Sequence, residues 1–439
     1  MRLDREHAHA LDAADPLAAW HDRFVLPRED GRELVYLCGH SLGAQPVIAT
    51  DFVDEVLRDW RALGVEGHFE ARHPWMTYHR RLAVPLASLV GAEPSEVVAM
   101  NTLTVNLHFM LATFYRPGGV RTAILIERGA FPSDHHAVES QVRWHGLDPA
   151  RELILISPRP GEELLRTEDI VATIEREASR LALVMLPGVQ YLTGQVLDVE
   201  AITHAALRAG CRVGWDLAHA IGNVPVQIHD SGADFAVWCH YKYLNGGPGA
   251  VGGAFVHARH ARDRSLLRLA GWWGHEPETR FMMEPTFEAT PGADGWQVSN
   301  PPILAMAPVV ASLQHFQHVG LDALRQKSIT LTGYFEALVR ARLEGRVEIL
   351  TPTAPERRGA ALSLRMTGLD REAGRRVFTG LRRRGILPDW REPNVIRAAL
   401  VPFYNRYDDA WRCVDALVSE LTDVERSSAA PSAPRPHRG

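Results

Sequence analysis

The sequence is poor in cysteine and has no long apolar run. Its four cysteines occur at positions 38, 211, 239 and 413, and none forms a C-x-x-C pair. This pattern excludes a disulfide framework and a cysteine-rich zinc site, and it favours reduced thiols in a cytoplasmic protein. No apolar stretch approaches the roughly 20 residues that a membrane helix needs. Because residues 1–7 are too polar for a secretory signal, we expect no targeting segment.

An excess of charge of one sign is also missing. The formal net charge is -5, with 23% charged and 46% hydrophobic residues. Such a balance offers no broad basic field, so we expect neither nucleic acid nor a membrane as a partner. The 439 residues exceed the roughly 250–300 at which a single core stops growing, so two domains are expected.

Short apolar runs alternate with stretches of helical periodicity from about residue 50 onward. This alternation is typical of an α/β fold, in which helices cover both faces of a mainly parallel sheet. The strand-like runs are 122–126, 153–156, 181–186, 212–215, 235–238 and 251–256.

We predict a large domain over residues 50–305, with a mainly parallel seven-stranded sheet. We expect a helical stretch from after residue 302 to about residue 343, and a smaller α+β domain over 306–425. We expect residues 1–49 to pack with the small domain. Residues 426–439, rich in Ser, Ala, Pro and Arg, are expected to form a disordered tail.

Two polar residues follow apolar strand-like runs. Asp216 ends the run 211–215, and Lys242 follows the run 235–239. Parallel α/β sheets gather ligand-binding residues beyond the carboxyl ends of their strands. Pyridoxal phosphate (PLP) chemistry needs a lysine that holds an aldehyde as a Schiff base and an acid that keeps a pyridine nitrogen protonated. Taken alone, Asp216 is also explained as a helix N-cap, and Lys242 as a residue at a solvated strand end. Taken together, the two residues favour a PLP site.

Three further features have a ligand-binding interpretation beside a structural one. A periodic apolar stretch begins at residue 103, where free helix amides suit a phosphate, although capping by Thr102 or Thr104 is the commoner use. Phe131 either stacks on a cofactor ring or fills the core. Arg397 lies inside an apolar run and needs a carboxylate from a substrate or from the protein.

Two motifs are set aside. Residues 247–252 match G-x-G-x-x-G, but the glycines precede a strand-like run instead of opening a helix, so a dinucleotide site is not expected. The 21 histidines include pairs at 135–136 and 257–260, yet no set has the spacing of a metal site. We therefore expect no metal.

Together these segments resemble kynureninase, a PLP enzyme of the aspartate-aminotransferase fold (fold type I), over about residues 35–420. The matching stretches occur in the family's order at 103–108, 131–134, 216–223, 241–245, 271–275 and 299–302. The resemblance implies a PLP-dependent transferase-like large domain and a homodimer with shared active sites. It implies hydrolysis of L-kynurenine or 3-hydroxy-L-kynurenine to anthranilate or 3-hydroxyanthranilate plus L-alanine, in tryptophan catabolism and NAD biosynthesis.

The resemblance also assigns roles to residues at the expected site. It implies that Lys242 carries the cofactor, that Asp216 pairs with the pyridine nitrogen, and that Tyr241 is a candidate acid near the phosphate; these are the expected catalytic residues. The implied cofactor contacts are Leu103, Thr104, Phe131, Asp134, Asp216, His219, Tyr241, Lys242, Trp272 and Asn300.

Residues that contact the substrate are implied in the same way. Arg397 matches the clamp for the substrate α-carboxylate. His68 matches a position near the aryl end of the substrate, and Asn300 matches one that faces the cofactor and the substrate. Trp272 and Asn300 are expected to act across the dimer interface. One position departs from the family: Pro187 stands where some relatives have a cofactor-contacting serine, and proline has neither a hydroxyl nor an N–H to offer.

Two alternatives remain at the level of sequence. A cysteine desulfurase-like lyase shares the fold but needs a nucleophilic cysteine in the C-terminal part, where Cys413 lies in a helical pattern unsuited to a mobile loop. A catalytically silent PLP-binding protein is the other, although the joint presence of Lys242, Asp216, Tyr241 and Arg397 argues against it. The sequence leaves the choice between kynurenine and its 3-hydroxy form open, and His68 and Asn300 slightly favour the latter.

Overall fold

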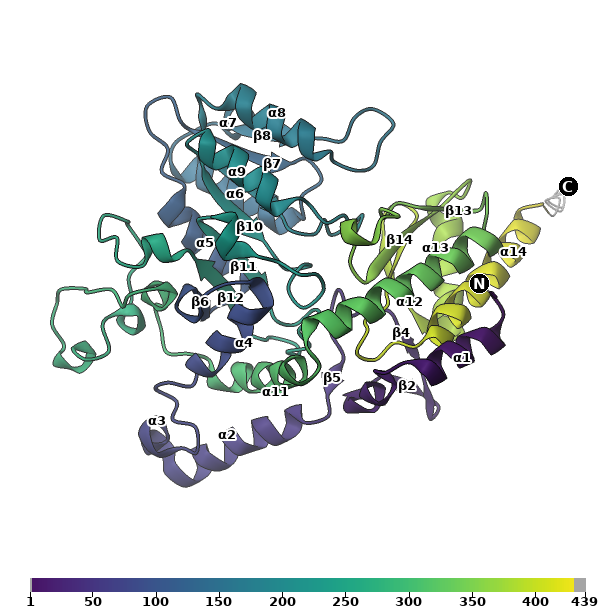
Figure 1. The fold of residues 1–439 in the computed structure, drawn as a ribbon, viewed down its shortest axis with the longest axis horizontal. Coiled ribbons are helices and arrows are strands. Elements are labelled where there is room, and N and C mark those ends of the chain that lie inside the picture. The colour runs from purple at the N-terminus through teal and green to yellow at the C-terminus, as the bar shows by residue number, and fades with distance from the viewer. Residues whose placement is uncertain (1, 430–439) are drawn as a thin grey trace, which may run out of the picture.

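The structure is a computed structural model that describes residues 2–429. Figure 1 shows two bodies, a larger one built around a sheet with helices on both sides and a smaller one where the helices nearest the two termini lie side by side. The long helix α12 (Leu321–Arg342) extends from the boundary between the bodies into the smaller one.

The large body contains a seven-stranded sheet of order β6-β12-β11-β10-β9-β7-β8. Its neighbours are parallel from β11 to β8, whereas β12 runs antiparallel to both β11 and β6. The mainly parallel sheet is thus confirmed. The strands are β6 (Val97–Ala99), β7 (Ala123–Glu127), β8 (Leu153–Ile156), β9 (Leu181–Pro187), β10 (Arg212–Asp216), β11 (Phe235–Cys239) and β12 (Gly252–Val256).

Two apolar layers cover the faces of this sheet. Along β11, Phe235 and Val237 pack in the layer with α5 and α6, whereas Ala236 and Trp238 pack in the layer with α4, α8, α9 and α11. Because both faces are buried, the strands are continuous apolar runs. The helices of this body are α2 (Ala49–Leu63), α3 (Gly67–Glu70), α4 (Arg80–Val90), α5 (Leu103–Phe114), α6 (Pro132–Trp144), α7 (Pro149–Glu152), α8 (Thr167–Glu177), α9 (Val199–Arg208), α10 (Ile228–Ser231) and α11 (Ile303–Val319).

The small body has an antiparallel sheet of order β13-β14-β17-β16, covered by helices. Its strands are β13 (Val347–Ile349), β14 (Ala361–Met366), β16 (Asp389–Arg391) and β17 (Val395–Ala399). Beside α12 the helices are α1 (Arg5–Ala14), α13 (Arg371–Arg383) and α14 (Tyr407–Ala429). Two-residue strands complete the fold: β1 (Phe24–Val25) with β5 (Gln45–Pro46), β2 (Arg28–Glu29) with β3 (Arg32–Glu33), and β4 (Val35–Tyr36) with β15 (Ile386–Leu387).

Two expectations about this part of the chain need correction. The helical stretch expected after residue 302 is two helices, because Gly320 has φ +80° and lies between α11 and α12. The expected disordered tail does not begin at residue 426, since α14 continues to Ala429. Residues 430–439 lie outside the described part of the chain.

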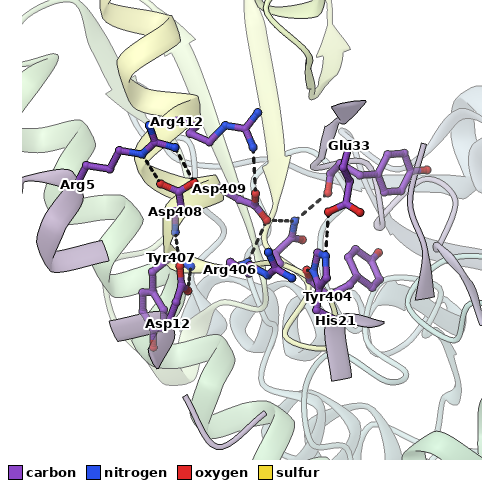
Figure 2. Close-up of polar contacts among 12 residues, drawn as sticks. Arg5, Asp12, His21, Glu33, Tyr404, Arg406, Tyr407, Asp408, Asp409 and Arg412 are labelled. Carbon is purple, nitrogen blue, oxygen red and sulfur yellow. Dashed lines mark hydrogen bonds and ion pairs between the residues drawn. The ribbon is translucent and has the colours of Figure 1, made fainter. Parts of the chain in front are cut away.

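The N-terminal segment makes polar contacts with the start of α14, as Figure 2 shows. Both carboxylate oxygens of Asp12 accept hydrogen bonds from first-turn amides, one from Tyr407 at 2.6 Å and one from Asp408 at 3.0 Å. Arg5 Nε donates to Asp408 Oδ1 at 2.7 Å. A residue of α1 therefore caps a helix almost 400 positions away in the sequence.

Candidate active site

A cavity opens at the carboxyl edge of the large sheet, beyond the ends of β7, β9, β10 and β11. Sheets of this type place ligands here, where the strands give way to loops. The expected cofactor contacts that line the cavity are Leu103, Thr104, Phe131, Asp134, Asp216, His219, Tyr241 and Lys242.

Lys242 is the one lysine of the chain that faces the cavity. The sequence contains only two lysines, and the other, Lys327, forms a buried ion pair with Asp15 at 2.8 Å. Lys242 Nζ lies 3.0 Å from His219 Nε2. An amine in this place is available for covalent chemistry with a ligand in the cavity.

The two side chains beside Lys242 are held in defined protonation states. Burial, and then the charge of Lys242, keeps the pKa of His219 well below its usual value, so the imidazole is neutral and accepts a hydrogen bond from the amine. Burial raises the pKa of the Tyr241 phenol. Tyr241 therefore keeps its proton at neutral pH and can donate it.

Three carboxyl groups share the cavity. Asp216 Oδ1 accepts a hydrogen bond from the Ala218 amide at 2.7 Å. Burial, and then the charge of Asp216, holds the pKa of Asp134 well above its usual value. Burial also raises the pKa of Glu127 to about 7, and Gln190 Nε2 donates to that carboxyl at 3.2 Å. Because Lys242 is the single lysine or arginine among the lining residues, these acids suit a second cation, and a protonated pyridine nitrogen would serve.

The N-terminus of α5 provides amide groups at the same cavity. Thr102 is the N-cap residue, but its side chain makes no capping hydrogen bond. The simple capping interpretation of Thr102 is therefore wrong. Leu103 and Thr104, in the first turn, line the cavity, where their amides suit an anion such as a phosphate. A lysine, a buried acid and a helix N-terminus together fit PLP.

Phe131 lies at the rim of the cavity instead of in the core. Its side chain is 42% exposed, and its ring meets Tyr191 edge-on at 5.2 Å between centroids. Lys242 Nζ is 5.9 Å from the centre of the Phe131 ring. An aromatic face this close to the lysine can cover a planar ligand attached there.

Arg397 lies beside this cavity, on β17 of the small body. It is 1% exposed, its Nη1 donates to the carbonyl oxygen of Tyr191, and its Nη2 forms an ion pair with Asp389. Tyr191 lines the cavity, so the guanidinium adjoins it. The sequence left open whether the carboxylate partner of Arg397 comes from a substrate or from the protein. In the described structure it is Asp389 of the protein.

The remaining expected site residues do not reach the cavity of their own chain. Trp272 is 41% exposed and donates to the Arg280 carbonyl at 3.1 Å. Asn300 is exposed. His68 Nδ1 lies 3.0 Å from the Val65 carbonyl oxygen, and His68 is not among the residues that line the cavity.

Several residues at the site were not anticipated. Glu127 and Tyr191 line the cavity, and Asp389 holds Arg397. Glu127 directly follows the run 122–126, as Asp216 follows its own run, and this pattern was sufficient to identify it. The sequence signal for Asp389 is weaker. Pro393, between Asp389 and Arg397, indicates a turn that would place the two residues on neighbouring strands.

A second polar cluster lies elsewhere in the large body. Among the described residues, Glu96, His229 and His257 form a group whose geometry could hold a metal ion. Glu96 Oε1 already accepts from His229 Nδ1 and the Ala258 amide, at 2.8 and 2.6 Å, and His257 Nδ1 accepts from the Arg259 amide at 3.1 Å. The ligand atoms are thus engaged in hydrogen bonds within the protein.

The cysteines do not contribute to the cavity. All four are free thiols, and Cys413 is fully buried in α14. Burial raises the pKa of this thiol to about 12, so it is not a thiolate at neutral pH. Within residues 2–429, none of the helices combines the length and the apolar character that crossing a bilayer requires.

Comparison with known sequences gives close relatives over nearly the whole chain. The kynureninase of Stenotrophomonas maltophilia (strain K279a) is 56% identical over 415 residues, which are 94% of this chain and 98% of that protein. The kynureninase of Xanthomonas campestris pv. campestris (strain 8004) is 56% identical over 413 residues, 94% of this chain and 97% of that one. The kynureninase C-terminal domain family matches residues 324–417.

Comparison with solved structures gives the fold. The apo cysteine desulfurase of Thermococcus onnurineus NA1 superimposes with a TM-score of 0.74 at 16% identity, covering 96% of this chain and 99% of that one. The cystine C–S lyase C-DES, in complex with cysteine persulfide, gives 0.73 at 18% identity, covering 89% and 97%. A C-DES mutant with glycine linked to its PLP cofactor gives 0.74. The chain therefore has the fold of fold-type-I PLP enzymes.

Proposed function

The chain belongs to the kynureninase family, and we propose how its cavity carries out that family's reaction. The protein is a PLP-dependent hydrolase acting on carbon–carbon bonds. Its reaction cleaves L-kynurenine or 3-hydroxy-L-kynurenine to anthranilate or 3-hydroxyanthranilate plus L-alanine. The observation that supports our assignment of residues is the convergence of Lys242, Asp216 and the N-terminus of α5 on one cavity.

The cofactor-binding roles follow from the chemistry of each group. The first-turn amides of α5, with Thr104, bind the phosphate, and Asp216 pairs with the pyridine nitrogen. Phe131 covers the ring, while Asp134 and His219 contact its polar edge. When bound, PLP supplies an electron-withdrawing ring that stabilises negative charge developing on the substrate's α-carbon.

Proton transfers fall to Lys242 and Tyr241. Lys242 Nζ takes the proton from the substrate α-carbon, and the neutral His219, 3.0 Å away, orients the amine. Tyr241 keeps its proton because burial raises its pKa, and it delivers that proton to the carbon that becomes the methyl group of alanine. Arg397 binds the substrate α-carboxylate and so fixes the reacting bond relative to the cavity.

The scarcity of lysine makes the central assignment easy to test. Borohydride reduction of the holoenzyme should trap the cofactor on Lys242, and peptide mapping needs to distinguish it only from Lys327 and the N-terminal amine. Lys242→Ala should abolish the visible absorption and lower turnover by roughly 1,000-fold or more. Lys327→Arg is the matched control. Trapping on Lys327, or normal turnover by Lys242→Ala, would contradict the assignment.

The desulfurase alternative finds no support at the site. Its chemistry needs a reactive cysteine thiolate on a mobile segment. Cys413, the one cysteine in the C-terminal part of the described chain, is buried in α14 with a raised pKa. Cleavage of kynurenine by the purified protein, without sulfide release from cysteine, is the expected result.

We propose further that the protein acts as a homodimer in the cytoplasm, with each active site completed by the other copy. Trp272 and Asn300 do not reach the cavity of their own chain. The segment between β12 and α11 that carries both projects from the large body in Figure 1. It exposes several large apolar side chains: Leu267, Leu269, Phe281, Met282 and Met283. Exposed apolar side chains gathered on one segment are typical of a subunit interface.

The choice between kynurenine and 3-hydroxykynurenine depends, in our proposal, on residues outside the cavity lining. We propose that His68 and Asn300 hydrogen-bond a ring hydroxyl and so favour the 3-hydroxy substrate. We compare kcat/KM for 3-hydroxykynurenine with kcat/KM for kynurenine. The double variant His68→Phe/Asn300→Ala should lower the ratio of the first value to the second by roughly tenfold. An unchanged ratio would contradict this role.

A further inference from the structure

Asp389 is the centre of a charged cluster behind the active-site arginine. On the neighbouring strands β16 and β17 it lies directly opposite Arg397. Its Oδ2 atom forms ion pairs with Arg397 Nη2 and, at 3.0 Å, with Arg391 Nη2. Ser41 Oγ donates to the same oxygen at 3.2 Å. The carboxylate is thus fixed from three directions.

The guanidinium of Arg397 is only partly satisfied by these contacts. Nη1 donates to the Tyr191 carbonyl and Nη2 to Asp389, whereas the buried Nε has no hydrogen-bond partner in the described structure. A guanidinium has five N–H donors, so an acceptor with two oxygens can still bind. The contact with Tyr191 joins the guanidinium to the cavity lining, and the contact with Asp389 joins it to the small body. Together these two contacts fix the orientation of the guanidinium, and they determine which of its edges remains for a ligand.

The charges of the cluster match a single carboxylate. Arg391 and Arg397 contribute two positive charges and Asp389 one negative charge. His40, buried 3.3 Å from Asp389 Oδ2, adds none, because burial, and then the charge of Arg397, lowers its pKa to about 3. The net charge of +1 is what an α-carboxylate neutralises when it enters the site.

We propose that Asp389 is a positioning residue for substrate binding: it orients the Arg397 guanidinium and neutralises Arg391, so that one edge of Arg397 is presented to the substrate α-carboxylate. The proposal rests on the proposed function, since it requires Arg397 to be the carboxylate clamp. Asp389 itself does not touch the substrate. Its effect is therefore on binding of the carboxylate and not on the chemical step.

The test uses the holoenzyme and two variants, Asp389→Asn, which keeps the size and one acceptor oxygen, and Asp389→Ala. We expect Asp389→Ala to raise KM for kynurenine by tenfold or more and Asp389→Asn by a smaller factor, with kcat within threefold of the parent. The inhibition constant of the decarboxylated amine of kynurenine, which lacks the α-carboxylate, should stay within twofold. A merely structural defect would affect both ligands alike.

A double-variant cycle separates this proposal from the proposed function. In an Arg397→Ala background, Asp389→Asn should have no further effect on KM. If Arg397→Ala leaves KM unchanged, the clamp assignment fails, and this inference fails with it. If Arg397→Ala raises KM but both Asp389 variants stay within twofold of the parent, or lower KM, the positioning role alone is overturned. Asp389→Asn decides the matter should Asp389→Ala not fold, and Glu372→Gln, an exposed change in the same body, is the control.

Discussion

At the scale of single residues, Glu127 combines near-complete burial with an ionisable group. Burial raises its pKa to about 7, from 4.5, so its ionisation is opposed by folding. The stability that this group contributes is present below about pH 4.5 and is lost as the pH rises through 7. The loss amounts to roughly 3 kcal/mol.

Glu127→Gln should remove this pH dependence. Glutamine cannot ionise but still offers an oxygen to Gln190 Nε2, so the variant should unfold at a higher temperature than the parent at pH 8 and at a similar temperature at pH 4.5. Thermal unfolding of the cofactor-free protein across this range checks the prediction. Glu372→Gln provides the surface control, and parallel curves for parent and Glu127→Gln would contradict the argument.

Phe131 is expected to contribute to cofactor affinity. Its ring flanks the cavity, 5.9 Å from Lys242 Nζ, so truncation removes a stacking surface without emptying the core. Phe131→Ala should weaken PLP binding by roughly tenfold, as expected for an aromatic contact of about 1.4 kcal/mol. Phe131→Leu, which keeps apolar volume without a planar face, should give an intermediate value when cofactor-free protein is titrated with PLP. Equal affinity for all three proteins would argue against stacking.

The residues predicted from sequence are those whose role follows from a strand end. Asp216 is the last residue of β10 and Lys242 lies three residues beyond the end of β11, and topology alone brings such positions together. Asp389 and Tyr191 were missed because their importance depends on Arg397, which each contacts from a different body. Tyr191 is 206 positions from Arg397 in the sequence, and Asp389 lies across a short hairpin from it, so neither contact leaves a periodic signal.

At the scale of elements, the start of α14 depends on a cap supplied by α1. Asp12 accepts hydrogen bonds from the amides of Tyr407 and Asp408 (Figure 2). Asp12→Ala leaves both donors without this partner and should lower the free energy of unfolding by about 1–2 kcal/mol. Urea unfolding measures the change, with the exposed Glu6→Ala in the same helix as control. KM should not change, because the cap lies away from the cavity; a loss of stability equal to that of the control would contradict the prediction.

Element boundaries were predictable where hydrophobic periodicity decides them. The ends of six strands lie within one residue of the ends of the expected apolar runs. Both faces of the sheet are buried, so each of these strands is a continuous apolar run in the sequence. The strand β6 (Val97–Ala99) was not anticipated, since three apolar residues are too few to form a pattern. The break at Gly320 was missed because apolar residues continue on both sides of it, and only its φ of +80° marks the turn.

At the scale of the whole molecule, the site draws on regions far apart in the sequence. The sheet edge provides Asp216 and Lys242, and the small body provides Arg397, which reaches the large body through the Tyr191 carbonyl. Ser363 of the small body likewise donates to the Leu192 carbonyl. The relative position of the two bodies therefore sets the distance between the lysine and the carboxylate clamp.

If a second copy completes each site, an inactive Lys242→Ala chain and an Asn300→Ala chain of impaired activity should restore activity when combined. In a dimer of Lys242→Ala and Asn300→Ala chains, one site carries both changes, while the other has an intact Lys242 from one chain and an intact Asn300 from its neighbour. Random mixing makes half of the dimers mixed, so an equal mixture should recover about a quarter of the parent activity. The subunits are exchanged by mild denaturation and refolding before the assay.

The outcome depends on which chain supplies Asn300, and this makes the experiment decisive. Lys242→Ala mixed with Arg397→Ala is the matched control, because both residues adjoin the cavity of a single chain and a mixed dimer then holds no intact site. Recovery in the first mixture and none in the control is the expected result. Absence of recovery in both, with dimers verified by light scattering, would place Asn300 at its own chain's site and require the segment between β12 and α11 to fold back toward Lys242.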